Sequence, residues 1–259
     1  MLEYINFLSY ITRFINAFFL PFFMDFQSLR SELLTKTKQQ LHDAVTIDVS
    51  ISQALSAYDD LQVQLNHLSK RLRDWTGYFV PELERRISTN AHFVQEISRG
   101  LAHEDSAMGG TPAQPTQQII ERFAKQINEL YSFQEELLMY LEKTLQEFAP
   151  NLQVLLGTTI TARVISAAGS LEHLSRLPSS TLQLLGAEKA LFRHLRTGAR
   201  SPKHGFIINH PLVSQASSKM RGKIARALAD KMSICAKLDY FKGEFLAKKY
   251  LQDLEKRFG

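Results

Sequence analysis

The feature that most constrains the fold is a heptad pattern between Tyr58 and Phe79. Its apolar positions follow one another at alternating steps of three and four residues. They are Tyr58, Leu61, Leu65, Leu68, Leu72, Trp75 and Phe79. Side chains at this spacing form a stripe along one face of a helix, and a second helix must cover that stripe. The pattern therefore predicts a long helix in a coiled coil, and a weaker pattern extends it back to Leu41.

The residues after this pattern are expected to supply the partner helix. Pro81 fits the first turn of a new helix that continues to about residue 101. Paired glycines and two prolines predict a loop over 103–116. A further helix ends before Pro150, with an apolar side made of Phe123, Ile127, Leu130, Leu137, Leu141, Leu145 and Phe148. We expect an antiparallel coiled-coil arm over residues 28–150, whose run from Ser28 to Phe79 would be on the order of 75 Å long. An ordinary helical bundle is the alternative.

Residues 151–259 show shorter helical patterns and no strand signals, so the chain is predicted to be all-α with a compact helical domain after the arm. The expected helices cover 151–156, 158–169, 170–178, 179–198 and 217–241, with a loop over 199–211. Ser179 or Ser180 is expected as an N-cap and Gly198 as a stop. The last helix has an apolar face of Ile224, Ala225, Leu228, Met232, Cys235 and Leu238. Its opposite face carries Arg221, Lys223, Arg226, Lys231 and Lys237.

Charge is divided unevenly between the two halves of the chain. Residues 1–150 hold 13 Lys and Arg against 19 Asp and Glu, a net charge of −6, whereas residues 151–259 hold 18 against 7, a net charge of +11. No acidic residue occurs from Lys189 to Ala229. Charged surfaces normally mix both signs, so this segment is predicted to face a polyanion. A stripe of Lys189, Arg193, Arg196 and Arg200, at steps of four, three and four, suits phosphate contacts. The alternative is that these basic residues form an ordinary solvent-exposed helix face without a ligand.

The sequence offers little for catalysis. It contains no phosphate-binding loop of the G-x-x-x-x-G-K-[ST] type, no G-x-G-x-x-G after a strand and no G-x-S-x-G, so neither an enzyme nor a cofactor is predicted. His194, His204 and His210 lack the spacing of a zinc site and are expected in loops and at the surface, so no metal ligand is predicted. The single cysteine, Cys235, is expected to be a buried, inert thiol and fits a reducing compartment.

The hydrophobic N-terminal segment, residues 1–27, is rich in aromatic residues. A signal peptide is not expected, because Glu3 and the lack of a small-residue cleavage site argue against it. A transmembrane helix would be interrupted by polar residues and a proline, which are Asn6, Arg13, Asn16 and Pro21. A docking segment or terminal helix, a membrane-associating segment and an unstructured segment all stay open.

The stretch GAEKALFRHLRTGARSPKHG, residues 186–205, closely resembles the Nop domain of box C/D ribonucleoprotein scaffold proteins. Three other stretches share this resemblance: the flanking PSSTLQLLGAEK and RGKIARALADKMSICAKLDYF, and DWTGYFVPEL at 74–83. The resemblance covers about residues 28–250. It implies a coiled-coil arm over 28–150 and a Nop domain over 151–259. The family's N-terminal domain would be reduced or missing over 1–27. Trp75, Phe79 and Pro81 are expected to pack the bend between the arm helices.

The resemblance implies a non-enzymatic scaffold in RNA-guided 2′-O-methylation. Such a scaffold binds a kink-turn of box C/D guide RNA together with the small kink-turn-binding protein on it, and self-associates through the coiled coil. The family's N-terminal domain, which recruits the methyltransferase fibrillarin, is much longer than the segment 1–27 of this chain. Recruitment is therefore not carried over, and fibrillarin stays open as a partner. A Nop-domain protein without methyltransferase recruitment and a membrane-associated relative are the alternatives. The lack of lysine repeats favours a prokaryotic, cytoplasmic setting.

The resemblance also assigns residues. Those expected to face RNA are Lys189, Arg193, Arg196, Arg200, Lys203, His204, Arg221, Lys223 and Arg226. Those expected to face the kink-turn-binding protein are Gly186, Ala187, Glu188, Ala190 and Leu191.

Overall fold

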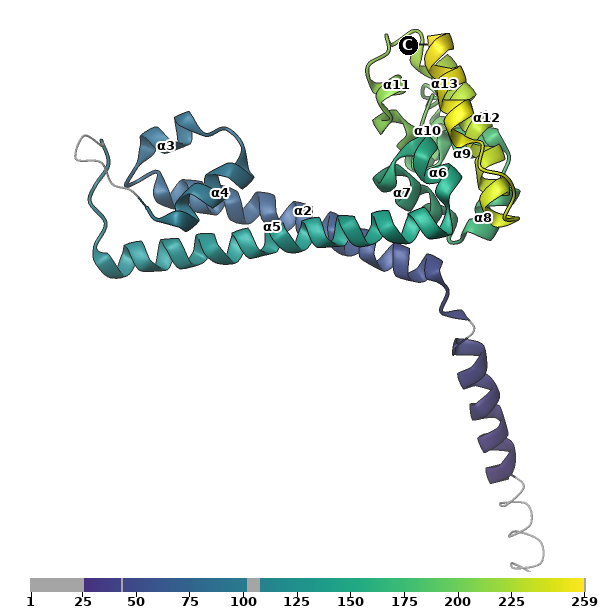
Figure 1. The fold of residues 1–259 in the computed structure, drawn as a ribbon, viewed down its shortest axis with the longest axis horizontal. Helices are drawn as coiled ribbons and strands as arrows, with labels where there is room; N and C mark the ends of the chain where they lie inside the picture. Colours follow the sequence, from purple (N-terminus) through teal and green to yellow (C-terminus); the bar gives the residue numbers. More distant parts are fainter. Residues whose placement is uncertain (1–25, 43, 102–107, 259) are drawn as a thin grey trace, which may run out of the picture. The chain divides into compact units, whose positions relative to one another are not determined.

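A computed structural model describes residues 26–42, 44–101 and 108–258 of the 259-residue chain. Regular structure in these ranges is helical, without a strand, which confirms the all-α prediction (Figure 1). After a helix over 26–42, the elements are α2 (Ile47–Thr76), α3 (Pro81–Arg86), α4 (Asn90–Arg99), α5 (Gln114–Phe148), α6 (Pro150–Leu156), α7 (Thr158–Ala168), α8 (Leu171–Arg176), α9 (Ser179–Leu184), α10 (Glu188–Thr197), the 3₁₀ helix η1 (Phe206–Asn209), α11 (Pro211–Ser214), α12 (Arg221–Tyr240) and α13 (Ala247–Phe258). In these ranges no helix is both long and apolar enough to cross a membrane.

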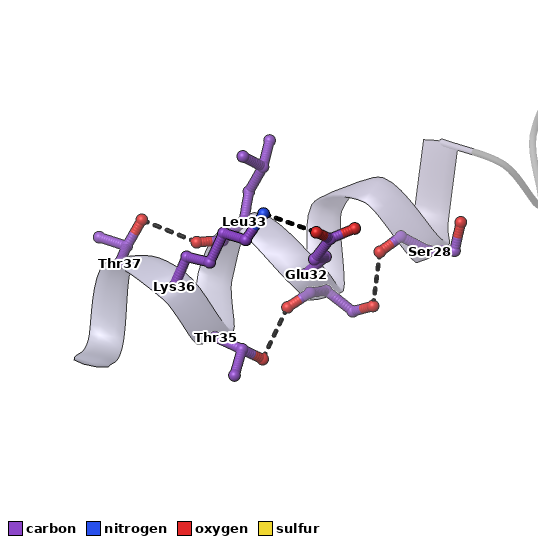
Figure 2. A network of polar contacts seen from close by, with 7 residues as sticks. Ser28, Glu32, Leu33, Thr35, Lys36 and Thr37 are labelled. Carbon is purple, nitrogen blue, oxygen red and sulfur yellow. Dashed lines mark hydrogen bonds and ion pairs between the residues drawn. The ribbon is translucent and has the colours of Figure 1, made fainter. Parts of the chain in front are cut away.

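The described residues before Ile47, which are the helix over 26–42 and residues 44–46, belong to a unit of their own. Figure 2 shows its side-chain contacts, including an ion pair of 2.6 Å between Lys36 and Glu32 and a 2.8 Å hydrogen bond from the Thr37 hydroxyl to the carbonyl oxygen of Leu33. The continuous helix expected from Ser28 to Phe79 is wrong, because residues 45 and 46 interrupt it. Both are β-branched, and their backbone N–H groups donate to the carbonyl oxygens of His42 at 3.3 Å and Ala44 at 3.0 Å, three and two residues back, rather than four residues back as in an α-helix. Most of the expected segment 1–27 lies outside the described residues.

In the second unit, α2 and α5 pack along each other as the expected arm, with α3 and α4 between them in the chain (Figure 1). Leu65 and Leu72 of the heptad pattern are buried, while Leu61, Leu68 and Trp75 are partly buried against the same cluster. The Trp75 ring lies 6.5 Å from the ring of Phe123 on α5, measured between centroids. The heptad pattern therefore located the contact face of α2 correctly.

The helix expected from Pro81 to about residue 101 is divided into α3 and α4. Pro81 begins α3 as predicted. Arg73 of α2 reaches the break, where it donates to the Asn90 side-chain oxygen at 2.9 Å and to the carbonyl oxygen of Ser88 at 3.1 Å. Its guanidinium also lies 4.2 Å from the centre of the Phe93 ring. The side chain of Arg73 thus provides a hydrogen-bond partner for the backbone between α3 and α4. Such a contact leaves no periodic pattern in the sequence.

The C-terminal helices are joined at a buried polar pair, Asn151 and Asp239. The Asp239 carboxylate accepts hydrogen bonds from the backbone N–H groups of Asn151 at 3.0 Å and Leu152 at 2.8 Å, and from the Asn151 side chain at 2.9 Å. The Asn151 side-chain oxygen in turn accepts from the N–H groups of Leu246 and Ala247, at 2.8 and 3.1 Å. Burial raises the pKa of Asp239, and these hydrogen bonds oppose that rise. One pair thus ties α12 to the first turn of α6 and to the start of α13.

Several expectations for this region hold. Gly157 separates α6 from α7, and α8 lies where a third helix was expected. The predicted apolar face of α12 is buried, except for the partly exposed Leu238. Cys235 is buried as expected, and burial, followed by the charge of Asp239, raises the pKa of its thiol to about 12.

Other expectations are wrong. The predicted helix 179–198 is two helices, α9 and α10, and the N-cap position of α9 belongs to Pro178 rather than to Ser179 or Ser180. The predicted loop 199–211 contains η1 and leads into α11. Each of these elements is too short to contain an apolar pattern from which a helix could be predicted.

His210, expected at the surface, is buried. Its Nδ1 accepts a hydrogen bond from the backbone N–H of Leu212 at 3.3 Å and caps α11, so Nε2 carries the proton and donates to the carbonyl oxygen of Leu155 at 3.1 Å. The ring is therefore held neutral. Burial lowers the pKa of His210, against smaller opposing effects of the Leu155 bond and of Glu255.

The lowered pKa of His210 predicts a loss of stability in mild acid. The folded chain binds fewer protons here than the unfolded chain, so the free energy of unfolding falls as the pH drops below about 6.5 toward the lowered pKa. We expect His210→Gln to be less stable by about 1–3 kcal/mol at pH 7.5 and to lose less stability than the unmodified chain between pH 7.5 and 5.5. Urea unfolding at both pH values measures this. An equal fall in both proteins would contradict the assignment to His210.

Candidate RNA–protein interface

The candidate interface is built around the break between α9 and α10. Gly186 lies in this break with φ +90°, a left-handed conformation that side chains disfavour. A Cβ added to Gly186 would lie 2.6 Å from the ring of Phe206, which occupies that space. The ring packs against the break from a distant part of the chain, so the helix predicted to continue from α9 ends here. This contact sets the direction in which α10 leaves α9.

Residues 203–206 are held against the end of α9 by three hydrogen bonds. The backbone N–H of Gly205 donates to the carbonyl oxygen of Gln183 at 2.9 Å, and that of Phe206 donates to the carbonyl oxygen of Leu185 at 2.8 Å. The Gln183 side-chain amide donates to the carbonyl oxygen of Lys203 at 2.6 Å. The backbones are so close that a Cβ on Gly205 would lie 1.9 Å from the Leu185 carbonyl oxygen. The predicted RNA contacts in this loop are thereby fixed beside the break.

The start of α12 joins the same surface. The side chain of Lys203 lies 3.6 Å from the place that a Cβ on Gly222 would take. Burial lowers the pKa of the partly buried His204, and the positive charges of Arg221 and Lys203 lower it further. Arg221 donates hydrogen bonds of 3.0 Å to the carbonyl oxygens of Ala216 and Ser214, so part of its guanidinium holds the preceding loop. Lys203, His204 and Arg221 are therefore neighbours, although 18 positions separate Lys203 from Arg221.

The predicted basic stripe lies on α10 in part. Lys189, Arg193 and Arg196 are exposed on this helix. Arg200 is exposed but lies beyond the helix, which ends at Thr197, so the prediction that it continues the stripe is wrong. Gly198 stops the helix as expected, with φ +67°. The other two predicted RNA contacts, Lys223 and Arg226, are exposed on α12.

The residues predicted to face a protein partner surround the break itself. Gly186 and Glu188 are exposed, and Ala187, Ala190 and Leu191 are partly buried. The Glu188 carboxylate accepts a hydrogen bond of 2.6 Å from the backbone N–H of Gly186. Glu188 therefore shapes the break in addition to presenting a negative charge on a positive surface.

Sequence reasoning missed Phe192 and Leu195, whose side chains are 63% and 69% exposed on α10. None of the ten residues of α10 is buried, so this helix offers its apolar side chains outward together with its arginines. An exposed ring beside Arg193 provides a stacking surface for an unpaired base or an apolar contact for a protein. The available signal was the spacing of Leu191, Phe192 and Leu195, which places three apolar side chains on a face of α10 separate from its basic stripe.

In the described ranges no three His, Cys, Asp or Glu side chains are grouped so that they could hold a metal ion. What the surface does offer is fixed positive charge, one acid, exposed apolar side chains and backbone brought close by two glycines. These groups suit binding to a phosphate backbone and to a protein at the same place.

Comparison with known proteins gives an independent result. A family model described as "Nop: snoRNA binding domain, fibrillarin" matches residues 100–259. An uncharacterized NOP5 family protein of Methanocaldococcus jannaschii is 41% identical over 233 residues, which are 81% of this chain and 56% of the relative. Nucleolar protein 58 of Schizosaccharomyces pombe is 37% identical over 216 residues, covering 74% of this chain and 42% of that protein. The chain thus spans about half the length of the curated relatives it matches.

A solved structure also resembles the chain. It is a crystal structure of a fibrillarin/Nop5p complex, with a TM-score of 0.55 and 26% sequence identity. The similarity covers 90% of this chain and 77% of the chain in that structure.

The close approach at Gly205 predicts the effect of one added methyl group. Gly205→Ala places its Cβ against the Leu185 carbonyl oxygen, so we expect it to destabilise the fold by at least about 2 kcal/mol. In Gly222→Ala, on the same surface, the new Cβ meets its nearest atom at 3.6 Å and gains helix propensity. This control should be at least as stable as the unmodified chain. Chemical denaturation of both variants measures the difference, and equal stability would contradict the described backbone contact.

Proposed function

The chain belongs to the Nop-domain family, and on that premise we propose that it is a non-enzymatic scaffold of a box C/D-type ribonucleoprotein. It binds kink-turn RNA together with the small protein already bound to that RNA, and it acts in RNA-guided 2′-O-methylation. One observation carries this proposal: hydrogen bonds hold residues 203–206 against the α9–α10 break, and Lys203 lies beside the start of α12, so exposed cations are brought next to the exposed residues of the break. A cytoplasmic location belongs to the same proposal.

The RNA half of the proposal rests on charge and shape. The exposed cations of this surface are Lys189, Arg193, Arg196, Arg200, Lys203, Lys223 and Arg226. Phosphate contacts from such side chains give affinity without reading sequence. Double-stranded RNA hides its base edges in a deep groove, so recognition relies on backbone shape and on bases that leave the helix. A kink-turn presents both features, and the exposed ring of Phe192 is suited to an unstacked base.

The protein half rests on the break itself. Gly186 exposes backbone, Glu188 supplies a negative charge, and Ala190, Leu191 and Leu195 supply apolar surface within two turns of the same helix. These residues lie next to the cations of α10. A complex of RNA and protein can therefore contact the cations and the apolar residues at once, whereas RNA alone or protein alone contacts one of the two sets. Binding to the preassembled complex should therefore be stronger than binding to the RNA.

Fibrillarin recruitment and self-association are finer parts of the proposal. The similarity to a chain of a fibrillarin/Nop5p complex supports fibrillarin recruitment. Self-association is supported by apolar side chains that stay exposed on the arm although its coiled-coil contact face is already filled within the chain. They are Val63, Ile119, Phe133, Met139 and Tyr140. Co-precipitation with fibrillarin and sedimentation of the purified chain test these parts separately from RNA binding.

Mobility-shift titrations with a box C/D kink-turn, with and without its small binding protein, test the proposed function. We expect tight binding to the preassembled complex and weaker binding to the RNA alone. Equal, weak binding in both cases would refute the composite surface.

Removing two cations from α10 should weaken RNA binding and reduce its dependence on salt. For Arg193→Ala/Arg196→Ala we expect the slope of log K against log salt concentration to fall by about 0.7–0.9 for each phosphate that the variant no longer neutralises. Arg122→Ala/Lys125→Ala is the matched control, because it removes two cations from α5 of the arm. Fluorescence anisotropy across a salt series measures the slopes. The same change of slope in both double variants would indicate a nonspecific charge effect and contradict the proposed surface.

Substitution of Glu188 should separate protein recognition from RNA binding. Glu188→Lys adds a positive charge, so binding to naked RNA should be unchanged or stronger, while assembly on RNA carrying its small protein should weaken about tenfold or more. Glu188→Gln retains an oxygen that can accept the Gly186 N–H, so it isolates the loss of charge from the loss of the local hydrogen bond. An intermediate effect of Glu188→Gln is expected. Normal assembly by Glu188→Lys would contradict the assigned protein contact.

A further inference from the structure

The segment that joins α12 to α13 exposes aromatic and positively charged side chains together. We define the C-terminal patch as Tyr240, Phe241, Lys242, Phe245 and Lys248. The three aromatic side chains are 37%, 74% and 47% exposed, in chain order. The rings of Tyr240 and Phe241 meet edge to face with centroids 4.9 Å apart, and the Lys248 ammonium lies 6.0 Å from the centre of the Phe245 ring. Exposed rings of this size in one short segment are unusual unless they have a ligand.

The charge around the patch favours a polyanion. Four lysines are exposed between residues 237 and 249, namely Lys237, Lys242, Lys248 and Lys249. Glu244 is the exposed acid in this range, because Asp239 is buried and hydrogen-bonded to the start of α6. Aromatic faces interleaved with lysines match the way proteins hold single-stranded nucleic acid, with bases on the rings and phosphates on the cations.

The backbone at Lys242 is a second, independent indication. Lys242 has φ 52°, and within the described residues it is the non-glycine residue with positive φ. The N–H of Gly243 bonds to the carbonyl oxygen of Leu238 at 2.8 Å, and the N–H of Lys242 bonds to that of Asp239 at 3.4 Å, which is the arrangement of a Schellman cap. Glycine is preferred at the left-handed position of this cap. A lysine there is held at a local disadvantage, which points to a role for its side chain.

The patch is connected to the proposed interface by the exposed face of α12. Outward positions recur along this face at steps of three and four, and they are Lys223, Arg226, Asp230, Ile234, Lys237 and Phe241. The helix has 20 residues and is therefore about 30 Å long. Its first turn belongs to the proposed interface and its last turn to the C-terminal patch, and α13 runs beside it (Figure 1).

We propose that the C-terminal patch binds single-stranded RNA that adjoins the kink-turn. Bases stack on Tyr240, Phe241 and Phe245, while Lys242 and Lys248 contact the phosphates between them. This inference rests on the proposed function for the location of the kink-turn at the other end of α12, and it adds a second RNA contact that the interface around α10 does not contain.

The test compares a kink-turn RNA with and without a ten-nucleotide single-stranded extension, by fluorescence anisotropy. The unmodified chain should bind the extended RNA more tightly. Phe241→Ala/Phe245→Ala should lose about tenfold in affinity for the extended RNA and bind the unextended RNA normally. Tyr78→Ala removes a ring outside the patch that is 75% exposed, as Phe241 is at 74%, and should leave both affinities unchanged. Normal binding of the extended RNA by the patch variant, or an equal loss on both RNAs, would overturn the proposal.

A free single-stranded oligonucleotide separates this proposal from the proposed function. Should the chain fail to bind any kink-turn, the proposed function fails, while binding of the oligonucleotide that depends on Phe241 and Phe245 would still support the patch. If Phe241→Ala/Phe245→Ala no longer bound an acidic protein but still bound RNA normally, the patch would be a protein contact and the RNA assignment would be overturned.

Lys242→Gly gives a result that a purely structural lysine would not. Glycine relieves the left-handed backbone, so the melting temperature should rise by about 2 °C. The same variant should bind the extended RNA less tightly, with a salt slope smaller by about 0.7. A more stable protein with unchanged RNA affinity and salt slope would overturn the role of Lys242.

Discussion

The close backbone contact between residues 183–186 and residues 203–206 is the interaction on which the candidate interface depends. Two glycines make it possible, because Gly186 leaves room for the Phe206 ring and Gly205 lies against the Leu185 carbonyl oxygen. The contact ends α9, redirects the chain into α10 and places Lys203 and His204 beside Arg221 at the start of α12. Without it, the basic residues would belong to a helix and a separate loop. With it, the basic residues of the loop lie next to the exposed residues of the break.

The helices behind this surface are fixed by buried packing and by the Asn151–Asp239 pair. Ile51 and Leu55 of α2 and Leu141 and Leu145 of α5 belong to the same core cluster as α6, α7 and α12. The base of the arm is therefore built into the C-terminal helices. A second cluster around Leu65 and Leu72 fills the other end of the arm. Leu182 of α9 and Ile224 of α12 also belong to the first cluster, so the backbone on either side of residues 203–206 is held before a ligand arrives, which reduces the entropy that binding would otherwise lose.

The sequence predicted the features that repeat and missed those that single tertiary contacts create. The heptad pattern and the helical class extend over many residues, so their average signal is strong. The break between α3 and α4 depends on Arg73 of α2, and the break at Gly186 depends on Phe206. His210 was expected at the surface because its partner, the Leu155 carbonyl, lies 55 positions away. Exposure of Phe192 was missed for the same reason, since only the fold shows that no residue of α10 is fully buried.

The central claim is that one surface, assembled from α10, residues 203–205 and the start of α12, meets RNA and a bound protein together. Cross-linking mass spectrometry of the chain assembled on a kink-turn RNA and its small binding protein tests this most directly. We expect RNA cross-links between residues 189 and 204 and between 221 and 226, and protein cross-links at residues 186–191. Cross-links confined to the arm, or RNA and protein contacts on separate faces, would contradict the account.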